Sequence, residues 1–341
     1  MSRLPARFAL DNGEDSGRLD TWSKVLIMRE LCLVTGGAGF IGSHLVEALL
    51  AAGHPVRVLD DLSTGRASNL AHMSPAPELI RGSVTDPVVV ERAVKGVGVV
   101  FHLAAVASVA RSLEDPLHCH GVCATGTLNV LDAARKHGVR RIVYAASSSA
   151  YGPASDPAGQ DEDTPLQPLS PYAAAKLAGE HYLASFAASY GTETVRLRFF
   201  NIFGPRQRAD SPYSGVIAIF TGMMSEGRAP AIHGDGLQTR DFVYVTNAVQ
   251  ALIKAAHAKG VSGQVYNVGT GKSVTLLDLV AALNKTLGTH LTPTHGPARV
   301  GDVRYSLAKI ARIRTALGYE PTVSFEEGIS RTVEWYRSGI R

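Results

Sequence analysis

The sequence predicts an α/β fold with a doubly wound parallel sheet and a smaller, mixed C-terminal lobe. From residue 29 to about 200, short β-rich runs alternate with helical stretches, the pattern of successive β–α–β units. The β-rich runs are largely apolar, which is typical of parallel strands buried on both faces. After residue 201 the alternation fails, and NIFGPRQRADSPYSG is rich in loop-forming residues.

The elements can be assigned in chain order. The six expected strands of the first part are LCLVTG, PVRVLD, ELIRGSV, GVVFHLAA, RIVYAAS and TVRLRFF. The helical stretches between most of them are SHLVEALLAAG, PVVVERAVKG, TGTLNVLDAARKHG and SPYAAAKLAGEHYLASFAASYG. Ser170 and Pro171 suit the N-cap and first turn of the last of these helices. Beyond residue 201, single strands such as QVYNVG separate the helices SVTLLDLVAALNKTLG, SLAKIARIRTALG and SFEEGISRTVEWYRSG.

We therefore expect three parts: an N-terminal extension (1–28), a domain built on the parallel sheet (29–200) and a mainly separate lobe (201–341). Some segments of the third part are expected to return to the second. In open parallel sheets, ligands bind beyond the carboxyl ends of the strands, so this lobe could cover that edge.

Composition excludes several classes of protein. No apolar run is long enough to span a membrane, and the N-terminus lacks the apolar segment of a secretory signal. Three cysteines cannot form a disulfide scaffold, so a cytoplasmic location is expected. The net charge of +4 is too weak and scattered to indicate nucleic acid, although it suits a small anionic ligand. The run HCHGVC (118–123) is interpreted as helix packing residues and not as a metal site, because it lacks a second ligand set.

A glycine-rich turn, TGGAGFIGSH, follows the first strand and opens the first helix. Gly36, Gly39 and Gly42 would permit the tight turn, the approach of a pyrophosphate and the packing of helix on strand. The next strand ends in Asp60, 24 residues beyond Gly36, where a carboxylate can accept hydrogen bonds from ribose hydroxyls and would repel a 2′-phosphate. The pattern predicts NAD as cofactor and makes residues 29–200 an NAD-binding Rossmann domain.

Candidate catalytic groups follow the later strands. The fifth strand ends in SSS (147–149), and Tyr172 and Lys176 lie one turn apart on the next helix. A lysine ammonium and a nicotinamide cation would favour the phenolate of Tyr172 and lower its pKa. Tyr172 could then take a proton from a substrate hydroxyl while a serine hydroxyl holds the developing carbonyl oxygen.

These motifs together resemble the extended short-chain dehydrogenase/reductases. TGGAGFIGSH, VLDDLSTG, HLAA, the serine run before AYG, SPYAAAK and RFFNIFGPRQ occur in order, and the resemblance covers nearly all of residues 29–337. Within that family the chain is most similar to the UDP-hexose 4-epimerases. The resemblance implies a tightly held NAD, a UDP-sugar substrate oxidised at C4 and reduced again on its other face, and a homodimer paired through the helices 121–136 and 171–190.

The resemblance also assigns residues to the two ligands. Ser147 matches the catalytic serine, 25 residues before Tyr172, and Ser148 is the alternative. The implied cofactor contacts are Gly36, Gly39, Phe40, Ile41, Gly42, Asp60, Asp61, Ser63, Thr64, Gly65, Ser83, Val84, Leu103, Ala104, Ala105, Tyr172, Lys176 and Phe200. The implied substrate contacts are Ser108, Ser147, Ser148, Tyr172, Asn201, Val216, His233, Arg240, Arg299, Asp302 and Ser306.

Three positions modify this expectation. Ser306 stands where relatives restricted to glucose and galactose carry a tyrosine beside C2 of the sugar, so an N-acetyl group should fit and UDP-GlcNAc/UDP-GalNAc should be turned over alongside UDP-Glc/UDP-Gal. Ser83 replaces an aspartate near the adenine, and Cys123 replaces an asparagine near the serine loop. The last two could loosen cofactor binding or slow the enzyme.

Other activities on this scaffold remain as alternatives. A 4,6-dehydratase resembles the chain in fold, but its Asp-Glu pair is replaced here by Ser148 and Ser149. A UDP-glucuronate decarboxylase is disfavoured because its relatives carry a glutamate in the same loop. A UDP-glucuronate 4-epimerase stays open, although the sequence assigns no pocket for the extra carboxylate. A non-catalytic NAD-binding regulator is disfavoured by the retention of Ser147, Tyr172 and Lys176.

Overall fold

The computed structural model describes residues 30–153, 156–209, 215–298 and 303–338. Its centre is a seven-stranded, wholly parallel sheet in the order β11-β6-β5-β4-β1-β2-β3. The strands are β1 (Cys32–Thr35), β2 (Val56–Asp60), β3 (Glu78–Arg81), β4 (Val99–His102), β5 (Arg141–Ser147), β6 (Glu193–Phe199) and β11 (Gln264–Val268). The prediction of a doubly wound α/β fold is confirmed.

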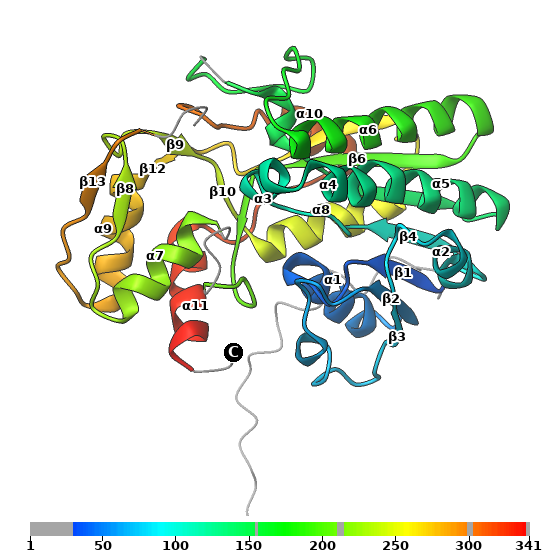
Figure 1. Cartoon of the computed structure of the whole chain (residues 1–341), viewed down its shortest axis with the longest axis horizontal. Coiled ribbons are helices and arrows are strands. Elements are labelled where there is room, and N and C mark those ends of the chain that lie inside the picture. Colours follow the sequence, from blue (N-terminus) through cyan, green and yellow to red (C-terminus); the bar gives the residue numbers. More distant parts are fainter. Residues whose placement is uncertain (1–29, 154–155, 210–214, 299–302, 339–341) are drawn as a thin grey trace, which may run out of the picture.

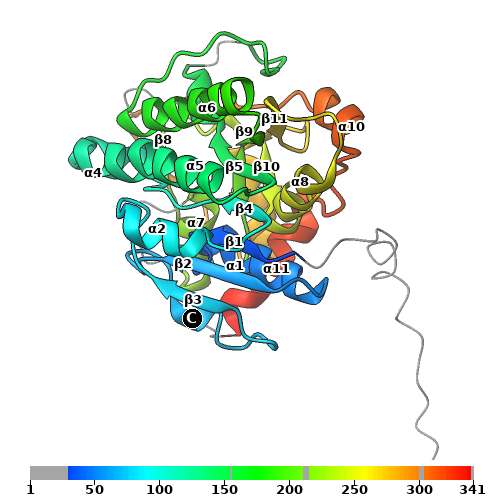
Figure 2. The same cartoon turned by 90° about the vertical axis from the view of Figure 1, so that its right-hand side faces the viewer.

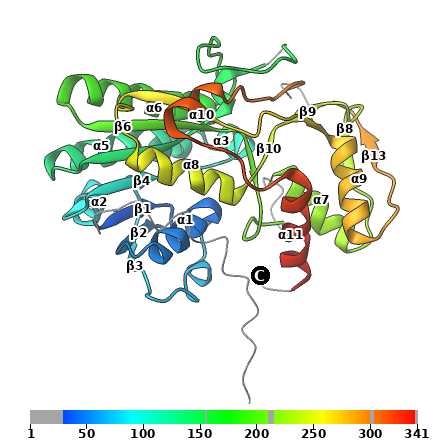
Figure 3. The ribbon, with the colours of Figure 1, turned by 180° about the vertical axis from the view of Figure 1, so that it is seen from behind.

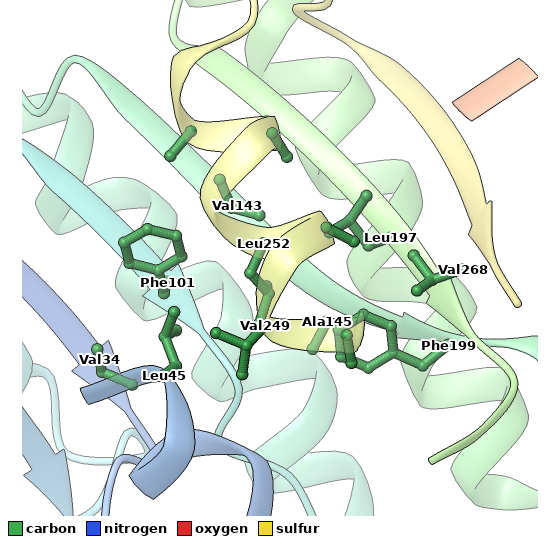
Figure 4. Close-up of a cluster of buried hydrophobic side chains, with 14 of the residues drawn as sticks. Val34, Leu45, Phe101, Val143, Ala145, Leu197, Phe199, Val249, Leu252 and Val268 are labelled. Carbon is green, nitrogen blue, oxygen red and sulfur yellow. The ribbon is translucent and has the colours of Figure 1, made fainter. Parts of the chain in front are cut away.

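Helices cover both faces of the sheet, as Figures 1 and 2 show. One face carries α2 (Pro87–Val94), α4 (Pro116–His120), α5 (Gly126–Lys136) and α6 (Pro171–Tyr190), with the short α3 (Val109–Glu114) beside α4 and α6. The other face carries α1 (Phe40–Ala51), α8 (Val245–His257) and α10 (Ala311–Leu317). In Figure 4, Val249 and Leu252 of α8 and Leu45 of α1 lie in one apolar cluster with side chains of the strands, namely Phe101, Val143 and Leu197.

A second lobe lies beyond the carboxyl ends of the strands, and Figure 3 shows it from behind. It contains α7 (Val216–Ser225), α9 (Leu276–Leu287) and α11 (Phe325–Arg337). Three two-stranded ladders accompany them: β7 (Asn201–Phe203) with β10 (Phe242–Tyr244), β8 (Ala231–His233) with β13 (Thr294–Gly296), and β9 (Thr239–Arg240) with β12 (Val274–Thr275). Its core is a separate apolar cluster in which Phe203, Phe242 and Phe325 contact one another.

The strand QVYNVG is a segment beyond residue 201 that returns to the main sheet: as β11 it pairs with β6. Two helices differ from the sequence prediction. The expected helix over 306–318 begins only at Ala311, because the backbone of Leu307 and Lys309 bonds to Gln160 instead. The helix expected over 121–136 starts with a π-helical turn, Gly121–Thr125, that follows α4 directly. Within the described residues, no helix is both long and apolar enough to cross a bilayer.

Candidate active site

A cavity of about 820 Å³ lies at the carboxyl ends of the central strands. Its wall contains Gly36 after β1, Leu103 after β4, Ser147 at the end of β5 and Phe200 after β6. The chain order of the strands reverses between β1 and β4, which is where open parallel sheets bind their ligands. The fold therefore brings residues from these four strand ends around one cavity.

The turn after β1 approaches the end of β4 so closely that only glycine fits. Gly36 has φ +69°, and a Cβ there would lie 2.9 Å from the amide nitrogen of Ala104. A Cβ on Gly42 would overlap the carbonyl oxygen of Gly36, so this glycine lets α1 pack against the turn. The N-cap of α1 is Gly39, whose lack of a side chain leaves the first N–H groups of the helix open to an anion. This cradle suits a dinucleotide pyrophosphate.

Asp60 ends β2 with only 7% of its surface exposed. Its Oδ2 accepts from Ala38 N–H and its Oδ1 from Leu62 N–H, both at 2.9 Å. Burial raises the pKa of Asp60, and these two hydrogen bonds oppose the rise. Each carboxylate oxygen retains a lone pair for a ribose hydroxyl. Gly65 is not among the residues of the cavity wall, and a Cβ there would lie 2.8 Å from Asp60 Oδ1, so the glycine leaves room for this carboxylate. Its contact with the cofactor stays a prediction.

The other predicted cofactor residues do line the cavity. They are Phe40, Ile41, Asp61, Ser63, Thr64, Ser83, Val84, Leu103, Ala104, Ala105 and Phe200, together with Gly39 and Gly42. The hydroxyl of Ser83, which replaces the aspartate of many relatives, lies 2.9 Å from that of Thr85. The contribution of each residue to NAD binding stays a prediction.

Ser147, Tyr172 and Lys176 meet on the cavity wall. Ser170 caps α6 by accepting from Ala173 N–H at 3.1 Å, which starts the helix where Tyr172 faces β5. The hydroxyl of Ser147 is near enough to the phenol of Tyr172 to lower its pKa. It also accepts from the N–H of Ser149 at 3.2 Å and from its hydroxyl at 2.9 Å. Ser148 is not among the residues of the wall, so the geometry favours Ser147 over Ser148.

The acidity of Tyr172 in the protein alone is governed mainly by burial. Burial raises the pKa of its phenol, the charge of Cys123 adds to the rise, and the hydrogen bond from Ser147 lowers it. The ammonium of Lys176 lies over the ring of Tyr144, 4.2 Å from its centroid. The expected lowering of the Tyr172 pKa by the lysine together with a nicotinamide cation stays a prediction.

The predicted substrate residues are only partly brought together. Ser108 lies on the cavity wall, where it caps α3 by accepting from Arg111 N–H at 3.2 Å. Asn201 and Ser306 lie outside the wall but meet each other, with Nδ2 donating to Oγ at 3.4 Å. Val216 begins α7, directly after the wall residue Gly215.

The remaining predicted substrate residues lie farther along the second lobe, outside the cavity wall. Arg240 Nη1 donates to the carbonyl of Val303 at 2.7 Å. His233 Nδ1 lies 3.3 Å from the carbonyl oxygen of Pro297. Arg299 and Asp302 are outside the described residues.

Sequence reasoning missed the basic side chains of the cavity. Arg66, Arg111, Arg206 and Arg208 all line it. Arg206 is positioned by Glu47 of α1, whose Oε2 accepts from Nη2 at 2.6 Å. In the sequence, Arg206 near the end of the motif RFFNIFGPRQ and Arg208 just beyond it lie in the loop directly after β7, and this pair was a usable signal for an anionic ligand.

The cysteines of HCHGVC are buried next to the catalytic groups. Cys119 and Cys123 are both fully buried, and Cys123 contributes to the electrostatic field at Tyr172 and Lys176. Over the described ranges, no three His, Cys, Asp or Glu side chains converge as a metal site would require.

Comparison with known proteins agrees with this geometry. The family model described as the NAD dependent epimerase/dehydratase family matches residues 32–269. A UDP-glucose 4-epimerase of Mycolicibacterium smegmatis is 42% identical over 90% of this chain and 98% of its own length.

Two solved structures are similar over the same extent. The UDP-N-acetylglucosamine 4-epimerase of Methanobrevibacter ruminantium, in complex with UDP-N-acetylmuramic acid, is 36% identical, with a TM-score of 0.87 over 92% of this chain and all of its own. The UDP-glucose 4-epimerase of Thermus thermophilus, in complex with NAD, is 39% identical, with a TM-score of 0.82 over 90% of this chain and 99% of its own. The chain belongs to the NAD-dependent epimerase/dehydratase family, a branch of the extended short-chain dehydrogenase/reductases.

Proposed function

We propose that the chain is a UDP-sugar 4-epimerase that acts on UDP-GlcNAc/UDP-GalNAc and on UDP-Glc/UDP-Gal. The observation that carries this proposal is the meeting of Ser147, Tyr172 and Lys176 on the wall of the cavity that also holds the glycine cradle and Asp60. Similarity to 4-epimerases of both sugar classes supports it.

The cradle around Gly36, Gly39 and Gly42 would hold the pyrophosphate of NAD, and Asp60 would hold the adenosine ribose. The residues present fit this cofactor, because Gly36 leaves no room for a side chain and both oxygens of Asp60 keep an acceptor site. When bound, NAD supplies a reversible acceptor for the hydride at C4 of the sugar.

Tyr172 is proposed as the acid–base residue. Its phenolic oxygen takes the proton of the sugar 4-hydroxyl, and returns it to the 4-keto oxygen once the sugar has turned its other face. Ser147 accepts two hydrogen bonds from Ser149. Its own proton is thus left to donate to the oxygen at C4 or to the phenolate, which stabilises the charge that develops there. Lys176, with 2% of its surface exposed, adds a buried positive charge one helical turn away.

The proposal that the enzyme accepts both N-acetylated and plain UDP-sugars rests on Ser306. Its small side chain meets Asn201 beside the cavity, and it would leave the space that an N-acetyl group at C2 needs. Asn201, Arg240, Arg299 and Asp302 are proposed, on resemblance, to hold the uridine diphosphate.

A UDP-glucuronate 4-epimerase is the second candidate. The observation in its favour is the presence of Arg111 and Arg208 on the cavity wall. Either guanidinium could pair with a sugar carboxylate. Turnover of UDP-glucuronate faster than of both neutral sugars would replace the first proposal with this one.

A homodimer is proposed as the working form. Leu113 and Leu117 are 64% and 83% exposed on α3 and α4, and Tyr182 is exposed on α6, which packs beside both helices. Burying such a patch against a second copy is favourable. Sedimentation should give twice the monomer mass, and Leu117→Glu should give the monomer mass.

The direct test is incubation of the purified protein with UDP-GlcNAc, and separately with UDP-Glc, without added NAD. Formation of the C4 epimer without net reduction of cofactor is the expected result. Tyr172→Phe should abolish turnover while retaining NAD. Full activity of this variant would disprove the acid–base role, and no turnover of either sugar by the wild type, even with NAD restored, would disprove the proposed function.

A further inference from the structure

Lys176 is a buried basic side chain whose position needs an explanation, because burial lowers its pKa and so disfavours the positive charge. Its ammonium lies 4.2 Å from the centroid of the Tyr144 ring, over the ring face. Tyr144 belongs to β5 and is fully buried. Burial keeps the pKa of its phenol well above the usual value, so the ring stays neutral. The face of a neutral aromatic ring attracts a cation most strongly where water is excluded.

The other charged and titratable groups around Lys176 do not provide the same hold. Glu180, one turn further on α6, is already bonded to Arg198, with three N–O distances of 2.8 to 3.1 Å. His102 of β4 is kept uncharged by burial, which lowers its pKa to about 3. Cys119 and Cys123 act on the pKa of Lys176 through charge, without a hydrogen bond to its ammonium in the described part of the chain. Tyr172 is itself the reacting phenol.

Helix α6 is shaped to receive the Tyr144 ring. The hydroxyl of Tyr144 donates to the carbonyl of Lys176 at 3.3 Å. Gly179 lies opposite this hydroxyl, where a Cβ would overlap it. The ring of His102 stacks against Tyr144, with centroids 5.6 Å apart and planes at 29°. The phenol ring on β5 is thus held by α6 and β4, and it can fix the lysine in turn.

We propose that Tyr144 is a positioning residue whose ring face holds the ammonium of Lys176 in place for proton transfer at Tyr172. This inference rests on the proposed function, in which Lys176 assists Tyr172. Tyr144 touches neither reacting atom. Tyr144 acts on Tyr172 only through Lys176. The attraction between the ammonium and the phenolate weakens as the distance between them grows, so holding the ammonium close stabilises the phenolate.

The test compares Tyr144→Phe, which keeps the ring face, with Tyr144→Leu, which removes it. For each holoenzyme, kcat and KM are measured with UDP-Glc and UDP-GlcNAc from pH 5 to pH 9. The Phe variant should stay within about threefold of the wild type in kcat. The Leu variant should lose about 10- to 30-fold in kcat, with KM little changed. Its rising limb of kcat should move to higher pH, because the phenolate of Tyr172 is less favoured.

Thermal unfolding and NAD content separate this effect from a general loss of structure. Equal losses of kcat in the Phe and Leu variants, or a pH profile that the Leu variant leaves unmoved, would overturn the proposal. If Tyr144→Leu does not fold, Tyr144→Met provides the same comparison with a more adaptable side chain.

Crystal structures of the two variants keep this test distinct from that of the proposed function. Inactivity of the wild type on UDP-sugars would disprove the proposed function alone. In that case a Lys176 ammonium that moves in the Leu variant but not in the Phe variant supports the positioning role, and one that stays in place in both overturns it.

Discussion

A buried histidine should make the stability of the protein strongly dependent on pH. The Nδ1 of His102 lies 2.7 Å from the hydroxyl of Thr35, and its Nε2 lies 2.9 Å from the hydroxyl of Thr127. The Thr127 hydroxyl uses its proton to donate to the carbonyl of Cys123 at 2.7 Å. Nε2 must therefore carry the proton of the neutral ring, while Nδ1 accepts from Thr35. A second proton on the ring has no place in this chain of hydrogen bonds.

The size of the effect follows from linkage. Burial lowers the pKa of His102 from 6.5 to about 3. Between pH 7 and pH 5 the folded protein leaves this ring neutral, whereas the unfolded chain protonates it, so stability falls as the pH falls. The loss is about 2 kcal/mol over that range. His44, whose pKa is lowered to about 4 by burial and by Arg206, acts in the same direction with about the same magnitude.

Urea unfolding of the holoenzyme at pH 7 and pH 5 measures this difference. The wild type should lose about 4 kcal/mol from the two histidines, and His102→Gln should lose about 2 kcal/mol less than the wild type does. His290→Gln, at an exposed position, is the matched control and should leave the difference unchanged. If His102→Gln retains the full pH dependence of the wild type, the assignment of a neutral, fully bonded His102 is wrong.

Three further substitutions test other parts of the structure. Gly36→Ala should lower the NAD content and reduce the free energy of unfolding by about 1–3 kcal/mol. Gly53→Ala, also at positive φ but with open space around it, should retain NAD. Equal loss of NAD in both variants would contradict the close approach of Gly36 to Ala104. Arg198→Met should lower the free energy of unfolding in urea by about 3–5 kcal/mol, because it leaves the buried Glu180 unpaired. The double variant Arg198→Met with Glu180→Leu should recover most of this lost stability. Ser306→Tyr should lower the ratio of UDP-GlcNAc to UDP-Glc turnover by at least about tenfold, and an unchanged ratio would remove the basis for the predicted breadth of substrate.

Features that depend on neighbours in sequence were predictable from the sequence. The alternation of apolar runs and helices determined the fold class, because burial on two faces and helical periodicity leave a pattern in each short segment. Gly36 and Asp60 could be located because the cradle and the acid lie within one β–α–β unit. Ser170 identified the start of α6 because a cap acts on the next few residues.

The tertiary structure decided how distant segments meet. The order β11-β6 in the sheet, the contact of Asn201 with Ser306, and the presence of Ser147 but not Ser148 on the cavity wall depend on how strands and loops align in space. Gly179 on α6 leaves space for the ring of Tyr144 on β5, and no local sequence pattern connects these two elements. Local propensity acts over a few residues, whereas burial, hydrogen-bond partners and pKa depend on every side chain that the folded chain brings within a few ångströms.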